Sequence, residues 1–172
     1  MPPAALAAPA INTSKVGRRT VSITTPDDLR AEIERIVTAD RAGQLTVLGN
    51  WSTGQALGHL AAWINYGFDG FPRTPPWFVK IILRLLKSRF FEAKGLSAGV
   101  RIPGATQGTW GVGPLTVDER EQRVLAAWAR LRAGPPSAPH PVFGLLSSDE
   151  WWAMHLARAR LHLSFLVPNA PK

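Results

Sequence analysis

The sequence predicts an all-α domain, a four-helix bundle with an additional basic helix and a long irregular crossover loop. Two observations favour this fold class. Apolar residues recur at helical spacing in several segments that begin with capping residues, and no segment shows the sustained alternation of a β-strand. The 172 residues are enough for one domain with a full core and too few to argue for two.

The N-terminal segment does not have the pattern of a secretory signal. Its Ala-rich run has no basic residue before it and is broken by Pro9. We therefore expect residues 1–20 to form a flexible N-terminal arm and residues 21–168 to form the domain. No window approaches 18 uninterrupted apolar residues, so we expect no membrane span and a cytoplasmic protein.

The first expected helix lies within TTPDDLRAEIERIVTAD, where Thr25 is a suitable N-cap and Pro26 suits the first helical position. The second lies within WSTGQALGHLAAWINYGF. There Ser52 and Gln55 have the spacing of a capping box, and apolar residues recur at helical period. His59 lies inside this second helix, close to its apolar stripe.

The third expected helix runs from about Pro76 to Lys94 and is basic. Residues 73–101 contain seven basic residues and one acidic residue, which accounts for most of the net charge of +8. We expect a solvated basic face over a buried apolar face. A nucleic-acid or membrane surface is the alternative, although no recognised nucleic-acid motif supports it. The Gly-rich residues that follow, 95–114, are expected to form the crossover loop.

Two more helices complete the bundle. Thr116 and Glu119 form a capping box before LTVDEREQRVLAAWARLRAG, and Ser147 and Glu150 form another before the last helix, which we expect to end at Pro168. One stripe of the last helix follows steps of four, three, four and three residues, and it consists of Trp151, His155, Arg158, His162 and Phe165. Both ends of this stripe are apolar, so the helix should be largely enclosed, and Arg160 is expected to mark its outer face.

Three blocks of sequence resemble a known family. INTSKVGRR, GNWSTGQALGHLAAWINYGFDG and HPVFGLLSSDEWWAMHLARARLHLSFL are similar to an uncharacterised branch of the DinB/YfiT-like superfamily of metalloenzymes, from about Ile11 to Leu166. The resemblance implies a four-helix bundle. It also implies a divalent metal, nickel or zinc, held by one histidine of the second helix and two histidines four residues apart on the last.

Two of the three implied metal ligands are present. His59 matches the first and His162 the last, but the remaining position is occupied by Arg158. Arginine offers no lone pair and stays charged, so it cannot be a ligand. His155 is a candidate replacement, although seven residues place its Cα roughly 10.5 Å from that of His162. The alternative is that these histidines are core residues, with the ring of His155 stacked on Trp151 or Trp63.

The replacement also suggests a different kind of site. Two histidines and an arginine that converge form a receptor for an anion, because a guanidinium presents a bidentate fork and a neutral imidazole donates one N–H. In this interpretation Arg158, Trp63 and Trp151 contact a small anionic ligand. The apolar walls of its pocket are expected to come from Trp51, Trp63, Trp151 and Trp152. A buried arginine needs such an anion, a carboxylate or several carbonyls.

Two functions therefore stay open. One is a metal-dependent enzyme of the thiol-dependent transferase or hydrolase type that the resemblance implies, with an incomplete histidine site. The other is a non-catalytic bundle that binds a small anionic molecule. The absence of cysteine excludes disulfides, thiolate metal sites and a cysteine nucleophile. A homodimer is compatible with a helical bundle, but no sequence feature decides it.

Overall fold

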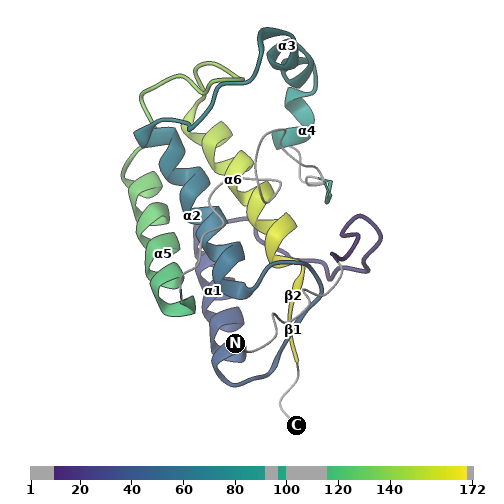
Figure 1. The fold of residues 1–172 in the computed structure, drawn as a ribbon. Coiled ribbons are helices and arrows are strands. Elements are labelled where there is room, and N and C mark those ends of the chain that lie inside the picture. The colour runs from purple at the N-terminus through teal and green to yellow at the C-terminus, as the bar shows by residue number, and fades with distance from the viewer. Residues whose placement is uncertain (1–9, 92–96, 100–115, 170–172) are drawn as a thin grey trace, which may run out of the picture.

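A computed structural model describes residues 10–91, 97–99 and 116–169 of the chain. Its elements, in chain order, are α1 (Pro26–Arg41), β1 (Leu45–Val47), α2 (Thr53–Asp69), α3 (Trp77–Leu85), α4 (Lys87–Phe91), α5 (Val117–Ala133), α6 (Ser148–Leu163) and β2 (Leu166–Pro168). Helices α1, α2, α5 and α6 lie side by side, and α3 and α4 stand at one end of them (Figure 1). The predicted mainly α-helical bundle is confirmed.

One continuous apolar core joins the four bundle helices. It includes Ile33 and Ile36 of α1, Leu57 and Leu60 of α2, and Leu163 of α6, each at most 2% exposed. Each helix contributes the stripe expected from its helical period, so burial of these stripes accounts for the arrangement. No helix in the described part of the chain is long and apolar enough to cross a membrane.

Each bundle helix begins with a capping box, as predicted for α2, α5 and α6. In α2 the Ser52 hydroxyl accepts a hydrogen bond from the backbone N–H of Gln55, whose side chain accepts one from the backbone N–H of Ser52. In α1 the predicted N-cap Thr25 forms the same arrangement with Asp28. These local contacts satisfy backbone donors that a helix start leaves free, and they fix where α2 and α6 begin.

A short two-stranded sheet was not predicted. β1 and β2 pair antiparallel, with Leu45 opposite Pro168 and Val47 opposite Leu166. Helix α6 therefore ends at Leu163 instead of continuing to Pro168, because the backbone of the following residues pairs with β1. Strands of three residues are too short to show an alternating pattern in the sequence.

The expected single basic helix is wrong in two respects. It is interrupted at Leu86 (φ −95°, ψ 12°), which separates α3 from α4. None of the residues of α3 is buried, so its apolar face is not covered as expected. Several side chains hold this region to the rest of the molecule: Arg84 Nε donates to the carbonyl of Val142 at 2.6 Å, Lys87 pairs with Glu150 at 2.5 Å, and the ring of Phe91 lies 5.5 Å from that of Phe143. The predicted crossover loop, apart from residues 97–99, lies outside the described residues.

The segment before α1 runs along the C-terminal end of α6. Arg18 donates to the hydroxyl of Ser164 at 3.2 Å, and Arg19 donates to the carbonyl of Leu166 at 2.6 Å. Arg160, expected on the outer face, donates to the carbonyl of Ile23 at 2.7 Å because this segment covers it. The flexibility of residues 1–20 and the boundary of the domain at residue 21 stay predictions.

Candidate functional site

Two of the predicted site histidines meet between α2 and α6. The ring centroids of His59 and His162 are 4.5 Å apart, with an angle of 69° between their planes. Trp51, just before the cap of α2, lies 4.9 Å from each ring and stacks on that of His162. His59 is buried, with 1% of its surface exposed, and His162 is partly buried. The capped start of α2 and the last turns of α6 thus position an aromatic and imidazole group in the bundle interior.

Arg158 lies one helical turn before His162 on α6 and extends this group. Its guanidinium carbon is 3.8 Å from the centre of the Trp63 ring, and Trp63 is 5.8 Å from His59. A guanidinium this close to an indole face makes a cation–π contact. We call Trp51, His59, Trp63, Arg158 and His162 the His–Arg cluster.

No anion among the described residues balances the charge of Arg158. Among the described residues Arg158 has no ion pair and no hydrogen bond, and its buried Nε has no partner. Burial lowers the pKa of Arg158 to about 10, with no carboxylate raising it. The group is still a cation at neutral pH, so the cluster carries a partly buried positive charge that favours an anion.

The same environment keeps His162 neutral. Its pKa is well below the ordinary value, chiefly because of burial and then because of His59 and the positive charges of Arg158 and Arg18. A neutral imidazole has one N–H donor and one lone pair. His162 therefore offers a hydrogen bond to an anion or a nitrogen to a metal, but no charge.

His155 is turned to other partners. Its ring stacks on Trp151 with centroids 5.7 Å apart and planes 13° apart, and the ring of Trp128 lies 6.4 Å away. The structure thus places His155 in the core and stacked on Trp151, which is the alternative that the sequence left open. Burial, Arg158 and His140 lower the pKa of His155 well below its ordinary value. The role of His155 as a third metal ligand stays a prediction.

Trp151 and His140 belong to this neighbouring aromatic group and not to the His–Arg cluster. His140 lies 5.7 Å from Trp151 and stacks on Phe143 at 4.9 Å. Its Nδ1 accepts hydrogen bonds from the backbone N–H groups of Val142 and Phe143, each at 3.2 Å. His140 therefore holds the turn before α6.

The donor set does not complete the three-histidine metal site that the resemblance implies. His59 and His162 supply two imidazoles, and the third position is the guanidinium of Arg158, which repels a divalent ion. Within the described residues no group of three His, Cys, Asp or Glu side chains lies close enough to hold a metal ion. Trp51 was predicted only as one of four tryptophans that supply apolar walls, and the structure places it against both histidines.

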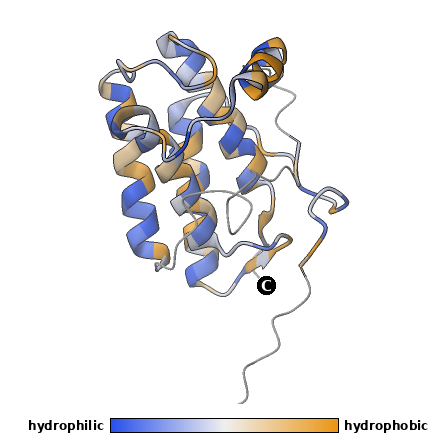
Figure 2. Ribbon diagram, turned by 45° about the horizontal axis from the view of Figure 1, so that its top comes forward, coloured by the Kyte–Doolittle hydropathy of each residue, from blue (hydrophilic) through white to orange (hydrophobic). Residues whose placement is uncertain are grey.

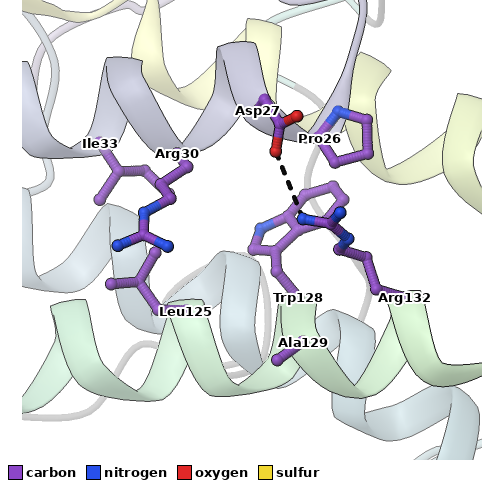
Figure 3. Close-up of a pocket in the computed structure, with 8 residues that line it drawn as sticks. All are labelled: Pro26, Asp27, Arg30, Ile33, Leu125, Trp128, Ala129 and Arg132. Carbon is purple, nitrogen blue, oxygen red and sulfur yellow. Dashed lines mark hydrogen bonds and ion pairs between the residues drawn. The ribbon is translucent and has the colours of Figure 1, made fainter.

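A separate hollow lies between α1 and α5 (Figure 3). It has a volume of about 100 Å³, and its lining includes Ile33, Leu125 and Trp128. Asp27 and Arg132 pair at 3.3 Å beside it, and both side chains are largely exposed. The hollow shares no residue with the His–Arg cluster.

The described fold and site define a mainly α-helical bundle with an imidazole and guanidinium cluster between two of its helices. The chain belongs to the family described as protein of unknown function (DUF1569), whose family model matches residues 17–169. No curated protein and no solved structure matches the chain. The matched region contains the whole His–Arg cluster, so the function is argued from that cluster.

Proposed function

We propose that the His–Arg cluster binds a small anionic molecule, with Arg158 as the charged partner. One observation carries the proposal: Arg158 is a partly buried cation, held against Trp63, that has no carboxylate partner among the described residues. A charge in a low-dielectric environment without a counter-charge lowers the stability of the folded protein. Such a loss of stability is expected at a binding site where a ligand supplies the counter-charge.

The neighbouring side chains suit a carboxylate bound by a guanidinium. Trp63 covers one face of the Arg158 guanidinium, which leaves its edge for two parallel hydrogen bonds. Neutral His162 adds a possible N–H donor, and Trp51 adds an apolar surface next to both histidines. A carboxylate attached to an apolar or aromatic group therefore fits the cluster best.

We also propose that the chain is a cytoplasmic, DinB-like bundle in which an ancestral metal site has become an anion site. The sequence blocks around His59 and His162 resemble the DinB/YfiT-like superfamily, which supports this relationship. Arg158 occupies the position of the third metal ligand, and this accounts for the change from metal binding to anion binding. The second candidate function is a metal-dependent enzyme of the thiol-dependent transferase or hydrolase type. The contact between His59 and His162 favours it, and Arg158 at the third position opposes it.

The test compares a carboxylate with a neutral molecule of the same shape. Calorimetric titration of the full chain with benzoate and with benzamide should show benzoate binding roughly tenfold more tightly, because only benzoate forms charge-assisted hydrogen bonds. Arg158→Met should remove this preference. Arg123→Met is the matched control, because Arg123 is exposed and lies on α5 outside the cluster. Equal binding of both molecules, or a preference that survives Arg158→Met, would contradict the proposal.

A further inference from the structure

Helix α3 presents a row of large apolar side chains to solvent. Trp77 is 73% exposed, Leu85 80% and Ile82 54%, and Phe78 and Ile81 are about half exposed at 52% and 48%. At 100° per residue these five positions fall within one 140° sector of the helix. We call them the α3 apolar face. A monomeric soluble protein rarely exposes such a contiguous group unless it contacts something.

The apolar face points away from the bundle. Val79 and Leu83, on the opposite side of α3, are partly buried, and Arg84 ties the end of the helix to the carbonyl of Val142. Figure 1 shows α3 standing beyond the ends of the bundle helices, and the ribbon in Figure 2 shows that many residues of α3 are hydrophobic. The described residues of the bundle therefore hold this helix and leave its outer face uncovered.

The charged side chains of the segment that contains α3 are all positive. Residues 70–91 contain five basic residues, Arg73, Lys80, Arg84, Lys87 and Arg89, and no acidic residue. Arg84 and Lys87 contact the bundle, whereas Arg73 and Lys80 have no ion pair within the described part of the chain. Lys80 follows Trp77 by three residues, so its charge lies at the edge of the apolar face.

We propose that α3 is an interfacial helix that binds an anionic lipid surface. Such a surface offers an apolar layer and negative headgroups together, which matches the apolar face and the flanking bases. Nucleic acid would pair with the bases and leave the apolar side chains in water. A second copy of the chain would bring like charges together. The nine residues of α3 span about 13.5 Å, so the helix lies in the interface and does not cross the bilayer.

The test is cosedimentation of the full chain with vesicles of phosphatidylcholine alone and of phosphatidylcholine with about 30% phosphatidylglycerol. Wild type should bind the anionic vesicles and should bind the neutral ones roughly tenfold less. The double variant Ile81→Gln, Leu85→Gln should lose at least about tenfold in binding, because it removes two inserted side chains. Lys80→Gln should lose roughly fivefold, and 0.5 M salt should weaken the binding of wild type further.

Matched controls lie elsewhere on the surface. Val47→Gln removes an exposed apolar side chain from β1, at the other end of the bundle (Figure 1), and Arg123→Gln removes an exposed charge from α5. Both should bind vesicles as wild type does, and circular dichroism should show that every variant is folded. Brominated lipid should quench the fluorescence of Trp77, and the quenching of the protein's fluorescence should be weaker in Trp77→Phe.

Three results would overturn the proposal. The first is that wild type does not bind anionic vesicles. The second is that the double variant Ile81→Gln, Leu85→Gln binds them as well as wild type does. The third is that wild type forms dimers that dissociate in this variant, and that no vesicle binding is seen. The last result would assign the α3 apolar face to a second copy of the chain. None of these outcomes depends on the His–Arg cluster.

Discussion

The guanidinium carbon of Arg158 lies 3.8 Å from the centre of the Trp63 ring, so a cation of α6 rests on an aromatic face of α2. This contact crosses the interface between the two helices that also bring His59 and His162 together. The indole face attracts the charge but supplies no counter-ion. The cation–π contact therefore holds Arg158 in place, but it offsets only part of the free-energy cost of burying the charge.

Arg158→Met should raise the free energy of unfolding of the ligand-free protein by about 1 kcal/mol. Burial lowers the pKa of Arg158 to about 10, which indicates a cost for the charged form. Methionine keeps most of the side-chain volume, removes this cost and loses the cation–π contact, worth about 1 kcal/mol, so the gain is modest. Urea unfolding at pH 7 measures it, with exposed Arg123→Met as the unchanged control. A clear loss of stability in Arg158→Met would show that the charge is balanced within the protein.

Arg158→His should give the protein a higher metal affinity than the wild type has. The substitution restores the histidine pair four residues apart on α6 and adds a third imidazole to His59 and His162. Elemental analysis of protein purified without chelator or affinity tag should find about one nickel or zinc per variant chain and little in wild type. The double variant Arg158→His, His59→Ala should lose this metal.

A metal ion found in the wild type would also have a definite meaning. If wild type already held about one ion per chain, and His59→Ala lost it, the anion-binding proposal would fail and the metal-dependent enzyme would stand. His155 would then be the first residue to test as a further ligand, because it lies on the same helix as His162.

The parts of the fold that depend on local sequence could be predicted. Capping boxes such as Ser52 with Gln55 involve residues three apart, and the core stripes follow a single helical period. The pairing of β1 with β2 could not be predicted, because it joins three-residue segments that are far apart in the chain. The apolar period of α3 was recognised, but periodicity does not tell whether a partner covers the apolar face.

The candidate site was predictable only in part. The stripe on α6 and the family resemblance together named His59, Arg158 and His162, and the structure brings these side chains into one cluster. The contact of Trp51 with both histidines was not predicted, because this residue precedes the helix and has no place in a helical stripe. His155 shares the stripe of His162, yet two turns of helix direct it to Trp151.

Acid should destabilise the protein between pH 6.5 and pH 4 through its buried histidines. Burial and Arg158 lower the pKa of His140 from 6.5 to about 4, and the pKa values of His155 and His162 are lowered in the same direction. In this window the unfolded chain binds a proton that the folded protein excludes, so stability falls as the pH falls. Below about pH 4 folded His140 is protonated as well, and its contribution to the loss stops growing.

His140→Asn isolates the contribution of that residue. The asparagine oxygen can still accept the hydrogen bonds that Nδ1 receives from Val142 and Phe143, but it does not titrate. Between pH 7 and pH 5 the free energy of unfolding of wild type should fall by about 2 kcal/mol more than that of the variant. Urea unfolding at both pH values measures the difference, and parallel losses in the two proteins would refute this assignment.

Gly67→Ala should destabilise the contact between α2 and α6. A Cβ atom at this position would lie 2.9 Å from Cγ of Pro136 and 3.0 Å from Cη2 of Trp151. Alanine favours the helix over glycine by about 1 kcal/mol, but overpacking against rigid rings costs about 1–3 kcal/mol. Because neither the proline ring nor the indole can bend away, we expect a net loss of about 1 kcal/mol. Thermal unfolding measures it, and Gly17→Ala, where a Cβ meets nothing within 4 Å, should leave the stability unchanged. A stability of Gly67→Ala at or above that of wild type would mean that α2 and α6 separate easily at this point.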